Sequence, residues 1–259
     1  MKNLLITLAT LAVFSSSCRK IIDIDQEESD IKTVIEANLF EGTQDFIVQV
    51  SKTGNFFGDN STKQITNASV TLNSLPLTNL GNGKYELPAF TSIAGTEYTL
   101  VVSENGNTFE STVTMPASIP IDDLTYFFQP ESPFSDEGYI TQIAIQDPAG
   151  VANFYRILID IQGESYGDIE DLILLDDLFV DGNRIEFPLF GIDVAQLGDT
   201  VSVDLFTIDK STFVYLDGLD DALSGGNGAP PANPQSNFSN GALGNFNVYA
   251  RDSKKVVVQ

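Results

Sequence analysis

The residue with the clearest chemistry is Cys18, the only cysteine in the chain. It follows Lys2, an apolar run from Leu4 to Phe14 and three serines, Ser15–Ser17. A basic start, a short apolar stretch and small residues before a cleavage point are typical of a secretory signal. A cysteine directly after that point offers the nucleophile best suited to thioether attachment of a lipid. We therefore expect residues 1–17 to be a lipoprotein signal peptide and Cys18 to be lipidated, with fatty acyl chains such as palmitate.

Lipidation at Cys18 would hold the protein on a membrane without spanning it. Each buried methylene contributes about 0.8 kcal/mol, and two or more acyl chains bind stably where one is marginal. The run Leu4–Phe14 is shorter than the roughly 20 apolar residues that a spanning helix needs. An ordinary signal peptide with an unrelated cysteine is the alternative, but the position of Cys18 at the small-residue boundary favours lipidation.

The composition excludes several kinds of catalysis. The chain has no histidine and no second cysteine, so Ser-His-Asp and Cys-His mechanisms, the usual zinc sites and disulfides are ruled out. A glycosidase-type carboxylate pair, a Ser-Lys device and an acidic calcium site remain open. The formal charge is −23, and without a Lys/Arg stripe the chain is not expected to bind nucleic acid. We expect a protein that is not an enzyme and has no cofactor.

Two acidic clusters are candidates for holding a cation. The denser cluster contains Asp168, Glu170, Asp171, Asp176 and Asp177. Oxygen ligands suit Ca²⁺, but the spacing lacks the glycine and the alternating pattern of the known calcium loop. An exposed strand or turn without a metal is therefore the preferred interpretation. The second cluster, Asp217, Asp220 and Asp221, is expected to be the solvated face of a helix.

Alternating apolar and polar residues are the main signal from residue 31 to residue 117, beyond a short acidic tether at residues 18–30. Alternate residues are apolar in segments 31–39 and 46–50, which is typical of half-buried strands. Asn105-Gly106 lies between two such runs and predicts a tight hairpin, because both turn positions need positive φ. Short strands without a helical stretch predict an immunoglobulin-like β-sandwich over residues 31–117.

Prolines between Pro116 and Pro133 mark the expected boundary with a second β-rich domain, residues 118–259. Alternation predicts strands over residues 139–145, 155–161 and 201–205, and a final strand or hairpin over 246–258. Asp181-Gly182-Asn183 is expected to be a hairpin turn that joins Leu172–Val180 to residues 185–188. The predicted fold class is all-β, with an antiparallel second domain and one short helix.

That helix is predicted near residues 209–224, where apolar residues fall near helical spacing. Asp209 or Ser211 is expected to cap its start, and Gly225-Gly226 to end it. A loop rich in Gly, Pro, Asn and Ser follows at residues 225–244. It is interpreted either as a recognition element, because loops on a rigid scaffold often bind ligands, or as a strap that covers a sheet edge.

Three stretches of the chain resemble a known family. The first is Cys18-Arg19-Lys20-Ile21-Ile22-Asp23-Ile24-Asp25, and the second is Met115-Pro116 with Ile119-Pro120-Ile121-Asp122. The third is Pro231-Ala232-Asn233-Pro234-Gln235-Ser236-Asn237 with Gly241-Ala242-Leu243-Gly244, preceded by Ile208-Asp209-Lys210. In these stretches the chain resembles a family of Bacteroidota lipoproteins known as domain of unknown function 4249. The resemblance covers essentially the whole mature chain, although Asn245 stands where relatives tend to have an aromatic residue.

The resemblance implies a location and a partner but no catalytic residue. Such lipoproteins commonly accompany TonB-dependent outer-membrane transporters. It therefore implies an accessory or capture module, anchored to the outer membrane through Cys18, beside a TonB-dependent receptor. An extracytoplasmic glycan-binding or adhesion lipoprotein is the alternative hypothesis, and a carboxylate-type enzyme is the third. Lys20 is followed by Ile21 and Ile22 instead of acidic residues, so periplasmic and cell-surface display both stay open.

Overall fold

The computed structural model describes residues 30–54, 62–133, 136–169, 171–190, 192–223 and 233–259. These ranges consist mainly of strands with one α-helix, which confirms the predicted all-β class with a short helix. The elements are β1 (Thr33–Phe40), β2 (Gly42–Lys52), β3 (Lys63–Gln64), β4 (Ser69–Leu72), β5 (Leu75–Pro76), β6 (Thr78–Gly81), β7 (Lys84–Ser92), β8 (Glu97–Glu104), β9 (Asn107–Thr114), β10 (Ile121–Gln129), β11 (Gly138–Gln146), β12 (Phe154–Ile161), β13 (Glu164–Tyr166), β14 (Ile173–Asp176), β15 (Arg184–Pro188), β16 (Thr200–Ile208), α2 (Lys210–Leu223), a 3₁₀ turn (Ser239–Gly241) and β17 (Leu243–Val257). Among the described residues, no helix has the length and apolar character needed to cross a membrane.

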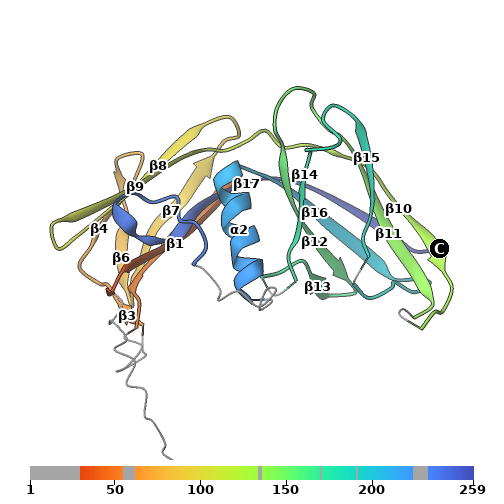
Figure 1. The fold of residues 1–259 in the computed structure, drawn as a ribbon, viewed down its shortest axis with the longest axis horizontal. Helices are drawn as coiled ribbons and strands as arrows, with labels where there is room; N and C mark the ends of the chain where they lie inside the picture. Colours follow the sequence, from red (N-terminus) through yellow and green to blue (C-terminus); the bar gives the residue numbers. More distant parts are fainter. Residues whose placement is uncertain (1–29, 55–61, 134–135, 170, 191, 224–232) are drawn as a thin grey trace, which may run out of the picture.

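The strands form three sheets. The largest has the order β13-β12-β16-β17-β1-β2-β7-β6, with β14 also paired to β12 and β3 to β2. The order β5-β4-β8-β9 gives a four-stranded sheet, and β10-β11-β15 gives a three-stranded one. All neighbouring pairs among the named strands are antiparallel except β1 and β17, which run parallel. In Figure 1 the largest sheet extends along the molecule, with β4, β8 and β9 toward one end and β10, β11 and β15 toward the other.

The first hydrophobic core lies between the four-stranded sheet and the β1, β2 and β7 part of the largest sheet. The alternation predicted for these strands is confirmed, since Ile35 and Leu39 are fully buried while Glu36 and Asn38 between them are exposed. The predicted hairpin is also confirmed. Asn105 and Gly106 join β8 to β9 with φ angles of 49° and 82°.

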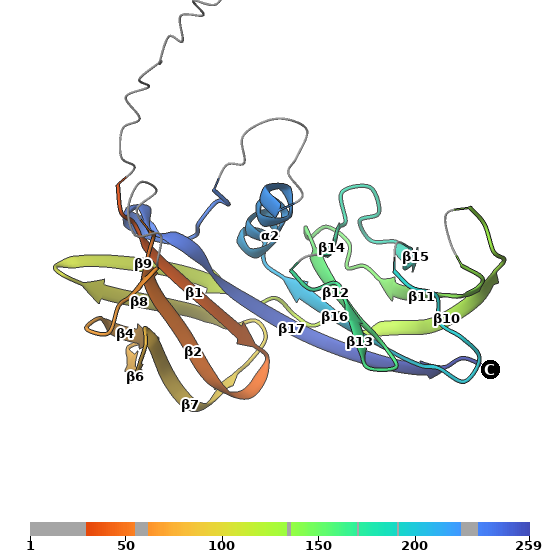
Figure 2. The same ribbon diagram turned by 90° about the horizontal axis from the view of Figure 1, so that it is seen from below.

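The last strand, β17, belongs to both halves of the molecule. Its residues Leu243–Tyr249 pair with β1, and residues Tyr249–Val257 pair with β16. Phe246, Val248 and Ala250 lie in the first core, and Val256 packs against the second. Figures 1 and 2 show this strand running from one half to the other. One continuous strand therefore occupies the segment for which either a strand or a hairpin was predicted.

The second core lies between the three-stranded sheet and strands β12, β16 and β17. Alternate residues of β12 and β16 supply it, namely Tyr155, Ile157, Ile159, Ile161, Val201, Val203 and Leu205. They include every apolar residue predicted for the inner faces of these two strands.

The hairpin predicted at Asp181-Gly182-Asn183 is wrong. The strand before the turn, β14, pairs with β12 in the largest sheet, whereas the strand after it, β15, pairs with β11 in the three-stranded sheet. Gly182 does have the positive φ of a turn residue, 71°. The turn chemistry was therefore recognised, but the two flanking strands cross between sheets because each finds its partner elsewhere.

The helix α2 confirms the predicted helix and its cap. The Asp209 carboxylate accepts hydrogen bonds from the Ser211 N–H (2.9 Å) and the Thr212 hydroxyl (2.5 Å), so it supplies a partner for one free N–H of the first turn. Leu216 packs with Phe206, Ile208 and Tyr249 in a third, smaller cluster. The helix thus covers the face of β16 and β17 that points away from the two main cores, and it lies between the two halves in Figure 2. The predicted end at Gly225-Gly226 lies outside the described residues.

The described part of the predicted loop, residues 233–242, is hydrogen-bonded both to β17 in the largest sheet and to β9 in the four-stranded sheet. Ser239 Oγ accepts a hydrogen bond from the Glu110 N–H (2.9 Å), and Asn240 Nδ2 donates to the Thr108 carbonyl (2.6 Å). Asn237 binds the main chain of Phe246 in β17. These contacts support the strap interpretation for this part of the loop, while residues 225–232 are not among those described.

Candidate functional site

The predicted lipidation site is not among the described residues. Cys18, the signal peptide and residues 19–29 of the tether all precede the first described residue, Asp30. The candidate sites described below therefore belong to the folded β scaffold and to α2.

The structure does not gather the predicted acidic cluster at residues 168–177 into one site. The Asp171 carboxylate accepts a hydrogen bond from the Gly167 N–H (3.1 Å), and the Asp176 carboxylate accepts one from the Leu178 N–H (3.3 Å). Asp168 instead borders a small hollow with Asp160 and Asp204. Glu170 is outside the described ranges. In the second predicted cluster, Asp217 and Asp221 are exposed on α2 and Asp220 is half-buried.

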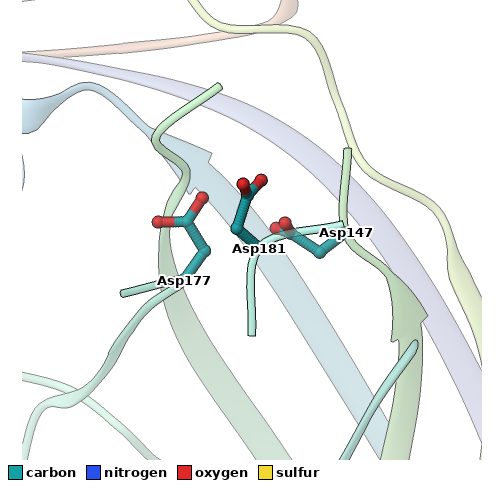
Figure 3. A group of neighbouring side chains, drawn as sticks. All are labelled: Asp147, Asp177 and Asp181. Carbon is teal, nitrogen blue, oxygen red and sulfur yellow. The ribbon is translucent and has the colours of Figure 1, made fainter. Parts of the chain in front are cut away.

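A different group of three aspartates comes together in the second half of the molecule. Asp147, Asp177 and Asp181 each offer a carboxylate oxygen within 4.8 Å of the other two (Figure 3). We call them the aspartate cluster. Asp147 and Asp177 are only 2% and 6% exposed, whereas Asp181 is exposed. Within the ranges that the structure describes, this is the group of acidic residues with the spacing to hold a metal ion.

The carboxylates of the aspartate cluster already serve as hydrogen-bond acceptors. Asp147 accepts from the Tyr155 hydroxyl (2.5 Å) and the Gly182 N–H (3.0 Å). Asp181 accepts from the Gly150 N–H (2.6 Å), and Asp177 from the Asn153 N–H (2.9 Å). The loop between β11 and β12 is thereby tied to the segment between β14 and β15. Burial raises the pKa of the Tyr155 phenol, and its bond to Asp147 raises that pKa further.

These bonds give the aspartate cluster a structural role. Oxygen ligands of this kind suit a hard cation, but the four N–H and O–H donors occupy the carboxylates and already satisfy part of their charge. The cluster could not be predicted from local spacing, because Asp147 lies thirty residues before Asp177, although Asp177 and Asp181 are close in the sequence. The one available signal is that two turn motifs, Asp147-Pro148-Ala149-Gly150 and Asp181-Gly182-Asn183, both begin with aspartate.

A second candidate site is a cavity of about 180 Å³ between α2 and the largest sheet, which we call the helix pocket. It is lined by Glu36, Ala37, Asn38, Phe40, Arg156, Ile169, Tyr215, Leu216, Leu219, Asn245, Asn247 and Tyr249. These residues come from β1, β12, β17, α2 and the segment after β13. Most of the polar ones were not identified from the sequence, since on β1 and β17 they alternate with apolar residues as the polar face of any half-buried strand does.

The parallel register of β1 and β17 creates the polar wall of the helix pocket. Asn38 lies opposite Asn247, and Phe40 lies opposite Tyr249. Because side chains alternate along a strand, the residues between them, such as Leu39 and Val248, point into the first core. The opposite face is left to asparagine and tyrosine side chains, over which α2 packs.

The asparagines of this wall form a directed chain of hydrogen bonds. Asn245 Oδ1 accepts from the Asn237 N–H (3.1 Å), and Asn245 Nδ2 donates to Asn247 Oδ1 (2.6 Å). Asn247 Nδ2 donates to Asn38 Oδ1 (2.9 Å), which also accepts from the Tyr249 hydroxyl (3.4 Å). Each amide oxygen in the wall thus accepts at least one hydrogen bond within the protein, and Asn38 Oδ1 accepts two.

Arg156 brings a positive charge to the helix pocket. Its Nη2 donates to the Gly167 carbonyl (3.1 Å), while its Nε is fully buried and has no hydrogen-bond partner in the described part of the chain. Burial raises the pKa of the Tyr249 phenol, and the adjacent Arg156 opposes that rise. Burial also raises the pKa of Tyr215, and the negative charge of Glu36 adds to this effect.

A larger hollow of about 950 Å³ lies beside the end of β10, bordered by Pro130, Pro133, Ile140 and Phe190. It is open, and its charged described lining residues, Glu131, Asp136 and Asp193, are all acidic. The larger hollow therefore has an acidic lining, whereas the helix pocket is smaller and includes Arg156.

Comparison with known proteins gives one family match. A family model described as Domain of unknown function (DUF4249) matches residues 19–255. A search of the curated proteins finds no significant match.

Proposed function

Because the chain belongs to the family described as Domain of unknown function (DUF4249), we propose that it is a lipid-anchored outer-membrane protein that captures a small ligand. In this proposal Cys18 carries the lipid, and the folded scaffold acts without catalysis beside a TonB-dependent transporter. The position of Cys18 after a short apolar run and three serines supports the anchor.

The helix pocket is the observation that supports the capture role. It lies between α2 and the largest sheet, and it brings together the side chain of Arg156 and a hydrogen-bonded row of asparagines. In small-ligand sites a few placed polar groups fix the orientation of the ligand, and a pocket of about 180 Å³ suits a ligand of only a few heavy atoms. Its walls come from strands far apart in the sequence, which gives a rigid frame for recognition.

The anchor is tested by membrane fractionation. The full chain and the Cys18→Ala variant are produced in a bacterium that processes lipoproteins, with labelled palmitate in the medium. We expect the unchanged chain to carry the label and sediment with outer membranes, and Cys18→Ala to do neither. A membrane-bound, labelled Cys18→Ala protein would contradict the assignment of the lipid to this residue.

The partner is tested by affinity purification of the tagged full chain from detergent-solubilised outer membranes. Recovery of a stoichiometric TonB-dependent receptor is the expected result. Recovery of the protein alone, from a preparation in which the receptor is intact, would contradict the accessory role.

A glycan-binding or adhesion lipoprotein is the second candidate function. It is supported by exposed aromatic side chains, since Phe128, Phe179 and Phe190 are 56%, 91% and 62% exposed. Aromatic faces on a rigid scaffold suit contact with sugar rings. Binding to immobilised glycans that is lost in Phe179→Ala would favour this function over small-ligand capture.

A further inference from the structure

We propose that two copies of this chain associate through an apolar tip in the second half of the molecule, and that each copy places Phe179 in an apolar hollow of the other. The apolar tip consists of Val151, Ala152, Leu178 and Phe179. The association depends neither on the lipid anchor nor on the capture role. It follows from three features: the rigid frame of the tip, the apolar hollow beside it, and the charges around both.

The tip is formed by two loops that are bound to each other at both ends. At one end, the Gly150 N–H donates to the Asp181 carboxylate (2.6 Å). At the other end, the Asn153 N–H donates to the Asp177 carboxylate (2.9 Å), and the Asp177 N–H donates to the Asn153 carbonyl (3.3 Å). The residues between these bonds, which include the whole tip, are therefore held side by side on a rigid frame.

The apolar side chains of the tip lie in solvent. Val151, Leu178 and Phe179 are 59%, 71% and 91% exposed. Phe179 is the most exposed large apolar side chain among the described residues. Large apolar side chains that gather on a surface are typical of an interaction site, and a preorganised loop loses little conformational entropy when it binds. The tip therefore has the form of a knob that suits an apolar hollow on its partner.

An apolar hollow of about 470 Å³ lies beside the tip on the same molecule. Its mainly apolar lining includes Pro116, Ala117 and Pro148, and Val151 and Ala152 of the tip also border it. Figure 1 shows the segment between β9 and β10 on the same edge of the molecule as the loops next to β14 and β15. A knob and a hollow that share an edge can pair reciprocally about a two-fold axis, which is the usual symmetry of a dimer.

The charges of the hollow complement those of the tip. The two loops that form the tip have aspartates as their only charged residues. Lys210 lines the hollow, is exposed, and forms no ion pair within the described ranges. In the dimer, Lys210 of one copy approaches the exposed Asp176 and Asp181 of the other. The same aspartates repel anionic headgroups, so a second copy is favoured over a lipid surface.

The other charged residue of the hollow, Asp209, is engaged by its own helix. Its carboxylate accepts hydrogen bonds from the Ser211 N–H and the Thr212 hydroxyl. Lys210 is therefore the charge of the hollow that is available to a partner.

The test is photocross-linking from position 179. The full chain with Phe179→p-benzoylphenylalanine is purified and mixed with vesicles of phosphatidylethanolamine and phosphatidylglycerol. Irradiation is expected to give a product with twice the mass of the chain. Peptide mapping should place the cross-link on residues 116–117 or 148–154 of the other copy. The same substitution at Phe128, an exposed aromatic residue of β10, is the matched control and should give no such product.

Two variants test the contacts by sedimentation equilibrium of the full chain in density-matched detergent. Phe179→Ser removes the knob. Lys210→Glu reverses the charge at the start of α2, where an acidic residue suits the helix dipole, so the helix should be retained. Each variant is expected to weaken dimerisation at least tenfold. Phe128→Ser and Lys63→Glu change exposed residues outside the tip and the hollow, and should dimerise like the unchanged chain.

Several results would overturn the proposal: an unchanged chain that stays monomeric at every soluble concentration, cross-links from position 179 to lipid or to residues outside the hollow, or unchanged dimerisation of Phe179→Ser. The cross-linking decides the matter if Phe179→Ser does not fold. Failure of the anchored role is a separate result, because membrane fractionation of Cys18→Ala measures it without reference to dimerisation.

Discussion

Asn237 pairs with the main chain of Phe246 as though it were a neighbouring strand. Its Oδ1 accepts from the Phe246 N–H at 3.0 Å, and its Nδ2 donates to the Phe246 carbonyl at 2.9 Å. The same Nδ2 also reaches Ser211 Oγ at the start of α2 (3.2 Å). On its other side, this part of β17 pairs with β1. One side chain therefore closes the open edge of β17 and connects that strand to the helix.

Asn237→Ala should destabilise the protein by about 2 kcal/mol, because it leaves the Phe246 N–H and carbonyl without their partners. Urea unfolding followed by circular dichroism measures the change. Asn233→Ala, an exposed asparagine of the same loop, is the matched control and should change stability by less than about 0.5 kcal/mol. Equal effects of the two substitutions would show that the Asn237 bonds contribute nothing measurable.

Gly244→Ala should prevent stable folding or cost more than about 3 kcal/mol. Gly244 has a φ of +85°, and a Cβ atom there would lie 2.1 Å from the Ile35 carbonyl oxygen in β1. Gly241→Ala is the comparison, since Gly241 has a φ of +73° but open space around the Cβ position. It should cost only the backbone strain of about 1–2 kcal/mol. Thermal unfolding of both variants checks the difference, and a Gly244→Ala protein as stable as Gly241→Ala would contradict the close approach.

Asp147→Ala should destabilise the second core by about 2–4 kcal/mol, since it strands the buried Tyr155 hydroxyl and the Gly182 N–H. Adding Tyr155→Phe removes the stranded hydroxyl. The double variant should therefore lose less stability than the two single variants combined. Urea unfolding of all four proteins gives the coupling. Additive losses would mean that the Tyr155–Asp147 bond does not couple these residues.

Asp217→Asn should raise the Tm at pH 7. Although Asp217 is exposed on α2, partial desolvation of its carboxyl raises the pKa, and the negative charges of Asp221, Asp220 and Asp176 raise it further. The folded state therefore binds this proton more tightly than the unfolded state. That contribution to stability is complete below the unfolded pKa and is lost as the pH rises through the raised folded value. The asparagine variant never acquires the charge, so its advantage at pH 7 should disappear near pH 3.

Calorimetric scans at pH 3, 5 and 7 test this pH dependence. Asp30→Asn, at an exposed position before β1, is the control and should change the Tm little at any of these pH values. An Asp217→Asn variant whose Tm advantage is the same at pH 3 and pH 7 would exclude the charged carboxylate as the cause.

The longer alternating strands, their inward faces and the helix could be predicted from local pattern, whereas β10 could not, because its alternation is weak and it lies between prolines. Alternation identified the buried residues of β1, β2, β12 and β16, because a side chain's face is set by the period of its own strand. Asn105-Gly106 predicted its hairpin, because both residues tolerate positive φ. Asp209 could be predicted as a cap for the same kind of local reason, since its carboxylate accepts a hydrogen bond from the Ser211 N–H in the first turn of α2.

Pairing between strands could not be predicted in this way. Alternation leaves a strand's partner undetermined, so Asp181-Gly182-Asn183 was assigned to a hairpin although β14 and β15 belong to different sheets. The parallel pairing of β1 with β17, more than 200 residues later in the chain, has no local signal either.

By itself, then, the sequence determined the longer alternating strands, the helix with its cap and the single cysteine available for a lipid, but not strand β10 (Ile121–Gln129), which lies in the proline-marked segment. Only the tertiary structure decided which polar residues share a site. Arg156, Asn38 and Asn247 look unremarkable in their own strands, and they line one cavity because β12, β16, β17 and β1 are consecutive neighbours in the largest sheet. The physical reason is that side-chain direction depends on neighbouring residues, whereas proximity between strands depends on hydrogen-bond register across the whole fold.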